Sequence, residues 1–438
     1  MSDYIVAIDL GTSHITGIVG EKKANGKFSI IAYENVETDS CVHRGIIYSS
    51  VNTAAVVGNL LKSLEAHLKG DYIDKVYIGV GGQSLRTIDR IEAMDFEEGK
   101  SVMEKDIAAL KEQCGKFKPN LADVLGIAPP VYVLDGRKTK EAAGVFCSKL
   151  EVHYKLVVGR ASIRQNIKNS IEAISGQQLA DIIVAPLALA DAILSPQYKE
   201  LGCALVDFGA GVTSVSVYKG GDLLHLCVIP FGGKLITRDL TSLQLTEADA
   251  EKLKKEKGSA ILLNEDENER VTIEMEGTER EVKLSDLNAI IEARATEIVD
   301  NVYARISEVI EPKQLGAGIV LAGCAAELKN LPELLHKKCG VKTGFSTIQK
   351  GLVDDSDEML GNPLYMMAIS LMLKGTEPCV SHYDVVADKG NQEGDKADVS
   401  VSEEKKHEKV IPKVKEKNKG KELKEKIKDW FDLFGEEA

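Results

Sequence analysis

The sequence lacks the cysteine spacing that marks a zinc site or a disulfide framework. It contains 8 cysteines in 438 residues, and they are scattered without any Cys-x-x-Cys pair. A reduced cytoplasm suits such cysteines, and neither structural zinc nor disulfide bonds are expected. Aromatic residues are scarce, at 5% of the chain, and the single tryptophan, Trp430, lies near the C-terminus.

An excess of positive charge and long apolar runs are missing as well. The chain carries 55 Lys and Arg against 68 Asp and Glu, a net charge of −13. Because binding to a nucleic-acid backbone requires clustered Lys and Arg, no nucleic-acid partner is expected. No apolar run approaches the ~20 residues of a membrane-spanning helix. Met1-Ser2-Asp3 leads directly into an apolar segment, so no cleavable signal is expected either.

One short pattern is present twice, and each copy lies between two apolar segments. The flanking segments 4–10 and 14–20, and 201–208 and 212–218, are predicted to be paired strands. Each copy is therefore expected to form a tight, Gly-rich hairpin. The two copies read Ile8-Asp9-Leu10-Gly11-Thr12-Ser13 and Val206-Asp207-Phe208-Gly209-Ala210-Gly211-Val212-Thr213.

Such a hairpin has the chemistry of a phosphate site. Glycines allow a run of backbone N–H groups to surround phosphate oxygens, and hydroxyls can add further donors. An Asp at a strand end can hold Mg²⁺ through water. One copy alone is usually an ordinary turn, but two copies indicate two related halves that clamp one polyphosphate. The expected ligands are Asp9, Gly11, Thr12, Ser13, Asp207, Gly209, Ala210, Gly211 and Thr213, with Asp9 and Asp207 on the metal.

The duplicated hairpin resembles the phosphate motifs of actin, the Hsp70 chaperones and the sugar kinases. The resemblance implies an α/β fold: an actin-like two-lobed ATPase with an insertion in each lobe. Its third element, an apolar strand followed by glycines that contact adenosine, is similar to residues 318–328, with Gly323, Cys324 and Ala325 at the adenosine position. Cys324 and Ala325 stand where relatives usually carry glycine, so the backbone is expected to approach the nucleotide less closely.

Motifs outside the hairpins resemble one branch of that superfamily, the FtsA family of actin-like bacterial division proteins. The resemblance implies ATP and Mg²⁺ as ligands and a site at the cytoplasmic face of the inner membrane, where the division ring forms. The implied partners are the FtsZ C-terminal peptide, further copies of the chain in a polymer, an anionic membrane surface and later division proteins. The motifs are His43-Arg44-Gly45-Ile46, Gly79-Val80-Gly81-Gly82, Gly159-Arg160-Ala161-Ser162 and Ile229-Pro230-Phe231-Gly232-Gly233-Lys234.

Further site residues follow from this resemblance. Gly232 and Gly233 are expected to offer backbone N–H groups to the γ-phosphate, although an ordinary turn explains them too. Glu251 and Lys254 share one face of a predicted helix, which the resemblance turns towards ribose and adenine; a solvated i,i+3 ion pair is the alternative. Ala185 stands where related ATPases often place a water-orienting Glu or Gln, so weak ATPase activity at most is expected.

The chain is too long for one hydrophobic core, and it divides into recognisable segments. The first lobe comprises 1–83, 162–198 and a closing helix at 357–380, and it is interrupted by an insertion at 84–161. The second lobe comprises 199–242 and 318–356, interrupted by a charged insertion at 243–317. The resemblance points to this second insertion as the docking region for FtsZ, with Arg294 as the named candidate.

The C-terminal residues have a different composition. Residues 381–420 contain few large apolar side chains and are predicted to be a disordered, charged linker. Segment 403–428 holds eleven Lys against six Glu, which favours attraction to anionic lipid. Residues 421–438 are predicted to form an amphipathic helix at a membrane surface, with docking of this helix on its own domain as the alternative. The membrane-binding candidates are Leu423, Ile427, Trp430, Phe431, Leu433 and Phe434, with Lys424 and Lys428 on the polar side.

Two functions from different classes remain open at this stage. The first is an ATP-binding adaptor that tethers the division ring to the membrane. The second is a soluble ATPase or small-molecule kinase of the same superfamily, which would need a substrate pocket and a catalytic base that the sequence does not reveal. A pilus-assembly or plasmid-partition relative is excluded by the resemblance alone.

Overall fold

The computed structural model describes residues 3–38, 40–97, 100–267, 269–275, 278–354 and 357–381, and these belong to one compact unit, Met1–Asp384. Except for Ser381, the predicted linker and amphipathic helix lie outside the described residues. No helix within the described ranges is long and apolar enough to cross a bilayer.

A five-stranded sheet forms the centre of the first lobe. β1 (Asp3–Leu10), β2 (His14–Lys22) and β3 (Phe28–Glu37) pair antiparallel, and β7 (Lys75–Val80) and β13 (Gln178–Val184) extend the sheet in parallel from β1. The order of the strands across this sheet is therefore β13-β7-β1-β2-β3.

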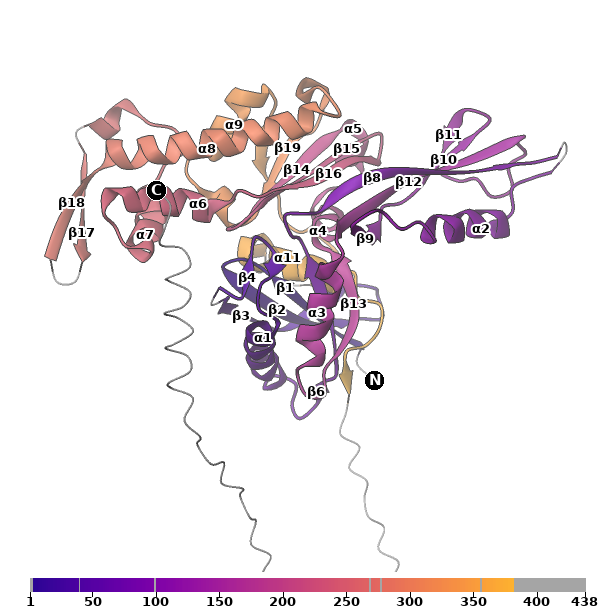
Figure 1. Ribbon diagram of the computed structural model, residues 1–438, viewed down its shortest axis with the longest axis horizontal. Helices are drawn as coiled ribbons and strands as arrows, with labels where there is room; N and C mark the ends of the chain where they lie inside the picture. The colour runs from indigo at the N-terminus through magenta and orange to yellow at the C-terminus, as the bar shows by residue number, and fades with distance from the viewer. Residues whose placement is uncertain are drawn as a thin grey trace, which may run out of the picture. The chain divides into compact units, whose positions relative to one another are not determined.

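Helices cover both faces of this sheet. α1 (Ser50–Glu65) packs on β2 and β3 and against α3 (Ser162–Glu172), whereas α11 (Pro363–Met372) packs on β1 and β2 and against α4 (Ala185–Ile193). A methyl group on Gly17 would meet Leu60 and Leu64 of α1, and one on Gly20 would meet Met372 of α11. Because side chains alternate along a strand, positions 17 and 20 face opposite sides, so each helix pair has its own face (Figure 1).

The second lobe is built on β14 (Cys203–Phe208), β15 (Thr213–Lys219), β16 (Asp222–Ile229), β19 (Gly318–Ala322) and β20 (Thr343–Phe345). The long helix α8 (Leu284–Ser307) lies against α6 (Gly233–Leu240), α7 (Glu247–Lys257) and α9 (Leu331–Cys339). Apolar side chains of α8, including Leu287 and Val302, share one buried cluster with those of β14, β15 and β19. Among the described residues of 243–317, the strands β17 (Arg270–Met275) and β18 (Thr278–Lys283) form a separate two-stranded sheet.

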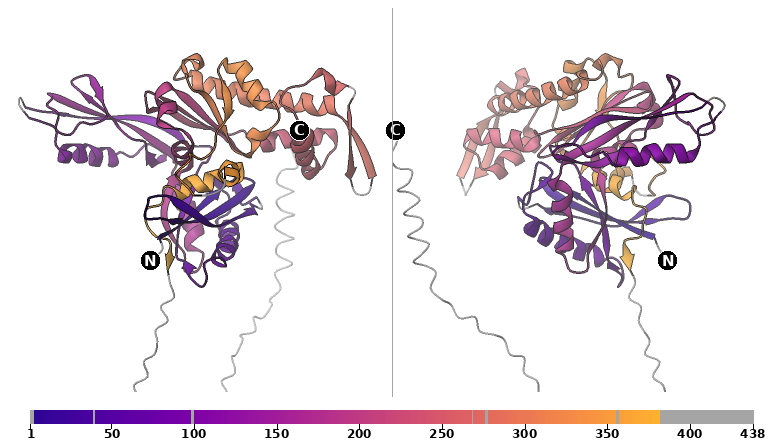
Figure 2. Two further views of the ribbon diagram at one scale, coloured as in Figure 1. Left: turned by 180° about the vertical axis from the view of Figure 1, so that it is seen from behind. Right: turned by 45° about the vertical axis from the view of Figure 1, so that its right-hand side comes forward.

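Residues 84–161 have their own apolar core. They contain α2 (Glu104–Gly115), β8 (Arg86–Asp95), β9 (Ala122–Ile127), β10 (Val131–Leu134), β11 (Arg137–Thr139) and β12 (Lys149–Arg160), whose buried side chains form a third cluster. β8 also pairs with β16 at Arg86 and Cys227, so these strands continue the sheet of the second lobe (Figure 2).

The local predictions agree with these elements. Both hairpins are confirmed as antiparallel pairs, β1 with β2 and β14 with β15. α11 lies within 357–380, where the closing helix was predicted, and Asn362 caps it through its side chain. One strand boundary is wrong: Leu201 ends α5 (Pro196–Leu201), and Gly202, with φ of 91°, separates this helix from β14.

Candidate functional site

The two Asp-Gly hairpins meet where the lobes face each other. A methyl group on Gly211 would lie 2.4 Å from Oγ1 of Thr12, so only a glycine fits at position 211. From α6, the Lys234 Nζ group donates a hydrogen bond of 3.2 Å to the carbonyl of Thr12 in the other lobe. The structure therefore brings the two predicted phosphate loops together.

Hydroxyl groups of the first hairpin already have partners. Oγ1 of Thr12 accepts the backbone N–H of Gly45 at 3.1 Å, which ties the motif around His43 to the hairpin. Thr38 donates its own hydroxyl to the carbonyl of Gly11. The Ser13 hydroxyl lies 3.1 Å from Nδ1 of His14. The Thr12 and Ser13 hydroxyls each retain bonding capacity, because a hydroxyl has one donor and two acceptor positions.

The second hairpin is held by the start of α6. N–H groups of Gly233 and Lys234 donate to the carbonyls of Gly209 and Ala210, at 3.0 and 2.8 Å. A helix start has N–H groups without partners inside the helix, and the hairpin carbonyls supply them. The Gly233 N–H is therefore occupied in this arrangement, and a phosphate contact from Gly233 requires that bond to open.

Thr213 does not have the predicted exposure to phosphate. It is fully buried, and its hydroxyl donates to the carbonyl of Phe231 at 2.8 Å. A hydroxyl has a single hydrogen to donate. Thr213 therefore fixes the loop before α6, and a phosphate contact from its hydroxyl stays a prediction that would require this bond to be exchanged.

Asp9 and Asp207 are the next-to-last residues of β1 and β14, and their two negative carboxylates repel each other. Burial raises the pKa of Asp9 to about 7, and the nearby Asp207 carboxylate adds to this effect. Burial also raises the pKa of Asp207 to about 6, against a hydrogen bond from Ser214. Gly323 is close, since a methyl group there would lie 2.4 Å from Oδ1 of Asp207. Two adjacent carboxylates without a cation are an arrangement that a divalent ion neutralises.

We expect the unliganded protein to lose stability as the pH rises from 5 to 8. The folded-state pKa of Asp9 lies above the unfolded value of 3.8, so the folded chain binds the proton more tightly. The stabilisation is complete near the unfolded pKa and disappears as the pH passes the folded one. The whole contribution, from the unfolded to the folded pKa, is on the order of 4 kcal/mol. Thermal melting of Asp9→Asn in metal-free buffer should show a shallower pH dependence; curves parallel to the wild type would contradict the assignment.

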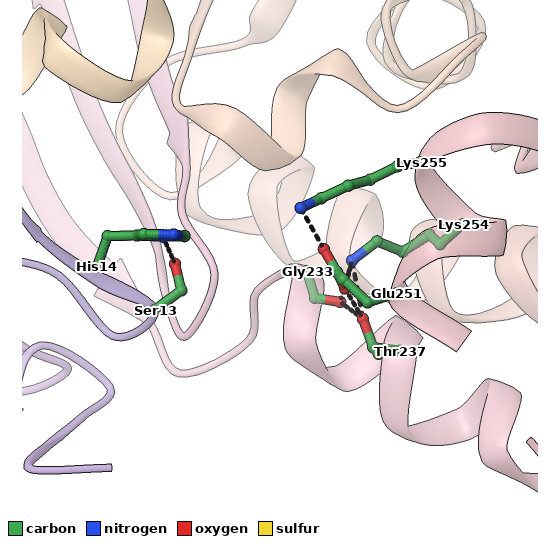
Figure 3. A network of polar contacts seen from close by, with 7 residues as sticks. All are labelled: Ser13, His14, Gly233, Thr237, Glu251, Lys254 and Lys255. Atoms are coloured by element: carbon green, nitrogen blue, oxygen red, sulfur yellow. Dashed lines mark hydrogen bonds and ion pairs between the residues drawn. The ribbon is translucent and has the colours of Figure 1, made fainter. Parts of the chain in front are cut away.

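A buried polar network joins α6 to α7 (Figure 3). Nζ of Lys254 donates to Oε2 of Glu251 at 2.6 Å, to Oγ1 of Thr237 at 2.8 Å and to the carbonyl of Gly233 at 3.1 Å. Burial lowers the pKa of Lys254, and Glu251 partly offsets the shift. Glu251 also accepts from Thr237 and pairs with Lys255 at 3.4 Å. The predicted shared face of Glu251 and Lys254 is confirmed. Lys254 is only 9% exposed, whereas the Glu251 side chain is 34% exposed, so the lysine end of the pair is the buried one.

The third motif lies beside the second hairpin. β19 ends at Ala322, Gly323 has φ of 85°, and Cys324 begins a short 3₁₀ helix (Cys324–Glu327). A methyl group on Gly233 would lie 2.9 Å from Cβ of Ala325, so Ala325 packs directly against the start of α6. A cavity of about 350 Å³ opens between this loop, β20 and α11, lined by Gly323, Glu327, Phe345, Thr347, Pro363 and Met366 among others. Glu251 and Lys254 are not part of its lining.

Two residues at the site were not predicted from the sequence. His14 lies beside the first hairpin, and Lys234 bridges the lobes. His14 directly follows the hydroxyl residues of the hairpin, so its position was a usable signal. No comparable sequence signal marks Lys234, because its hydrogen bond to Thr12 depends on how the two lobes meet.

Comparison with known proteins agrees with this geometry. Residues 204–370 match the family described as "Cell division protein FtsA". The Cell division protein FtsA of Porphyromonas gingivalis is 34% identical over 389 residues, which cover 87% of this chain and 80% of the relative. That of Neisseria meningitidis is 30% identical over 380 residues, covering 84% and 89%.

A solved structure gives the same fold. The PilM-PilN type IV pilus biogenesis complex superposes with a TM-score of 0.56 at 16% identity, covering 85% of this chain and 99% of that chain. At this identity the likeness concerns the fold only, and it is the two-lobed actin-like fold predicted from the duplicated hairpin. Since the sequence similarity extends over most of both chains, the chain belongs to the FtsA family of cell-division proteins.

Proposed function

We propose that the chain is an ATP-binding, actin-like adaptor that tethers the FtsZ ring to the cytoplasmic face of the membrane and recruits later division proteins. The observation that carries the proposal is the 34% identity to a cell division protein over 87% of the chain. The paired hairpins supply a site whose residues match the chemistry of a magnesium polyphosphate. Binding of nucleotide between them couples the site to the angle between the lobes.

The residues present fit Mg²⁺ bound through water. Asp9 and Asp207 offer carboxylate oxygens, which Mg²⁺ prefers, and their mutual repulsion is relieved by a cation. Among the described residues no cluster of three or more His, Cys, Asp or Glu is available. The proposed ion is therefore held by these two carboxylates together with water and phosphate oxygens, a set that suits the reluctance of Mg²⁺ to lose its hydration. Bound there, it would neutralise phosphate charge.

The protein groups proposed around the nucleotide have separate roles. Backbone N–H groups of the hairpins and the Ser13 hydroxyl contact phosphate, and the cavity beside Gly323 is the candidate space for the adenine ring, with apolar and polar walls. Ala185 is 2% exposed and begins α4. Its methyl group cannot orient a water molecule, which supports ATP as a conformational ligand with slow turnover at most.

The membrane part of the proposal rests on the sequence of the C-terminal residues. Segment 403–428 has eleven Lys against six Glu, and it runs into the predicted amphipathic helix that contains Trp430. Basic segments gain attraction from anionic lipid, and an apolar face with Trp and Phe binds at the interface. These properties favour a membrane adaptor over a soluble kinase, for which such a segment has no evident use.

The FtsZ peptide is proposed to dock on residues 243–317. Arg294, the candidate in this region, pairs with Asp239 at 2.5 Å and also with Glu297. Its side chain is 27% exposed, so one edge of the guanidinium remains reachable. An acidic group on a partner would therefore compete with two internal carboxylates for this arginine.

Replacing Arg294 with methionine should weaken binding of the FtsZ tail peptide about tenfold, because a charge-assisted hydrogen bond is lost. Peptide affinity can be measured by fluorescence anisotropy. Arg305→Met is a matched control, since Arg305 lies on the same helix and also pairs with a glutamate three residues on. Equal affinity of the Arg294→Met protein and the control, with melting unchanged, would place the docking surface elsewhere.

The whole proposal can be tested with purified components. The chain should float with anionic liposomes and carry FtsZ with it, and Mg-ATP should change the amount recruited. Recruitment of FtsZ without the chain, or flotation of the chain without any recruitment, would contradict the tether. Rapid phosphate transfer to a small molecule, at the ~1–100 s⁻¹ of kinases, would favour the enzyme instead.

A further inference from the structure

His14 and Ser13 form a hydrogen-bonded pair at the edge of the first hairpin. Nδ1 of His14 lies 3.1 Å from Oγ of Ser13, and both side chains are half-buried. Figure 3 shows this pair on one side and the α7 residues Glu251 and Lys255 on the other. The inference drawn from this pair rests on the proposed function, because it concerns how the same site binds phosphate.

The direction of the Ser13–His14 hydrogen bond depends on the charge of the ring. In the neutral tautomer with an unprotonated Nδ1, the ring accepts the hydrogen bond, and the Ser13 hydroxyl donates its single hydrogen to Nδ1. In the imidazolium form both ring nitrogens donate. Ser13 must then accept from Nδ1–H, and its own hydrogen is free for a phosphate oxygen. Starting from the tautomer with an unprotonated Nδ1, protonation of His14 thus converts the hydroxyl into a phosphate donor.

The groups around His14 act on its pKa in both directions. Burial lowers the pKa of His14, and the lysines of the second lobe, Lys255 on α7 and Lys234 on α6, lower it as well. Glu37, its register partner on β3, and Glu251 on α7 oppose them. Without a ligand these surroundings favour the neutral ring. A polyphosphate brings negative charge next to the ring and favours the imidazolium.

We propose that Ser13 and His14 form a proton-linked clasp on the nucleotide, so that phosphate binding is accompanied by uptake of a proton and weakens as the pH rises. His14 acts as a positioning residue through Ser13, and its positive charge adds attraction. The clasp makes the nucleotide occupancy of the chain sensitive to pH between 6 and 8, the range in which histidine changes charge.

The test compares Mg-ADP binding by calorimetry at pH 6, 7 and 8 in buffers of different ionisation enthalpy, at fixed free Mg²⁺. The His14→Gln variant keeps the size and hydrogen-bonding capacity of the side chain but cannot titrate, so the nucleotide's own ionisation is common to both proteins. Wild-type affinity should fall about tenfold more than that of His14→Gln between pH 6 and pH 8. Proton uptake should be largest near pH 7 in the wild type, where it is a substantial fraction of one, and be absent in the variant.

Two further variants of the chain test the role of Ser13 and provide a control. Ser13→Ala should show an intermediate pH dependence, because the ring charge remains while the hydroxyl is lost; a dependence equal to the wild type would overturn the role of Ser13. His225→Gln is the control, since His225 is also half-buried with a lowered pKa but lies on β16 beside Thr87. It should behave as the wild type.

The wild type also offers a direct measurement. The Cε1 proton of His14, observed by NMR, should titrate at a higher pH with Mg-ADP than without it, and an unchanged His14 pKa would overturn the clasp. Failure of the two proposals is distinguishable. Absence of nucleotide binding at every pH contradicts the proposed function, whereas binding with the same pH dependence in wild type and His14→Gln contradicts only this inference.

Discussion

Replacing Asp207 with asparagine should weaken Mg-ATP binding about 10–100-fold and, at the same time, make the unliganded protein more stable at pH 8. The loss of affinity follows because the asparagine amide keeps the shape of the aspartate side chain but not the charge that holds hydrated Mg²⁺. Replacing a residue that acts on a metal through an intermediate group typically lowers metal affinity about 10–100-fold. The gain in stability follows from the raised pKa of Asp207, about 6, and of Asp9, about 7. Above these values two negative charges repel each other, and the variant removes one.

Asp191 supplies the matched control for this prediction. It is a carboxylate in which burial is outweighed by Lys199 and Lys374, so its pKa is lowered and its charge is stabilising. Asp191→Asn should therefore lower the melting temperature and leave Mg-ATP affinity unchanged. Calorimetry and thermal melting at pH 8 separate the two cases. If Asp207→Asn kept full affinity while folded, the two-hairpin site would be wrong.

The hairpins were predictable because their information is local. Alternating or continuous apolar residues on both sides of a short Gly-rich segment determine strand, turn and return strand without reference to the rest of the chain. The two Asp positions at strand ends follow in the same way. Their mutual proximity required one more step, the duplication, which indicated that two related halves face each other.

The partners of individual polar groups were not predictable in this way. Thr213 looks like a phosphate donor in the sequence, but the loop ending at Phe231 takes its hydroxyl. Lys254 looks like one half of a surface ion pair in the sequence, but its ammonium group also donates hydrogen bonds to Thr237 and Gly233 of α6. Each of these contacts joins elements whose packing depends on the whole core, and periodicity along one helix does not contain that information.

The segment 243–317 shows the same limit at a larger scale. Its charge suggests a separate insertion, and that boundary stays a prediction. Yet Leu287, Ile291 and Val302 on α8 share a core with the sheet strands. A deletion of the entire segment would therefore remove part of the second-lobe core, which is why the docking prediction uses a single substitution at Arg294.

The other large effect is expected at the C-terminus, outside the described residues. Trp430→Glu should release most of the protein from anionic liposomes without changing ATP affinity, because it puts a charge at the centre of the predicted apolar face. Trp430→Phe, which keeps an aromatic ring, is the matched control and should remain bound. Flotation assays of the three proteins, together with one truncated after Gly420, measure the attached fraction.

The strength of this attachment should depend on self-association. Full burial of one apolar side chain is worth ~1.5–3 kcal/mol, and side chains at an interface are only partly buried, so a single helix binds reversibly. Several tails on one polymer gain avidity without any new contact. Wild-type attachment should therefore rise steeply with protein concentration. Salt should reduce the attachment only in part, because salt screens the attraction between the Lys-rich segment 403–428 and anionic lipid but not the apolar contact. Flotation of the Trp430→Glu or truncated protein at the wild-type level would remove the main support for a membrane tether.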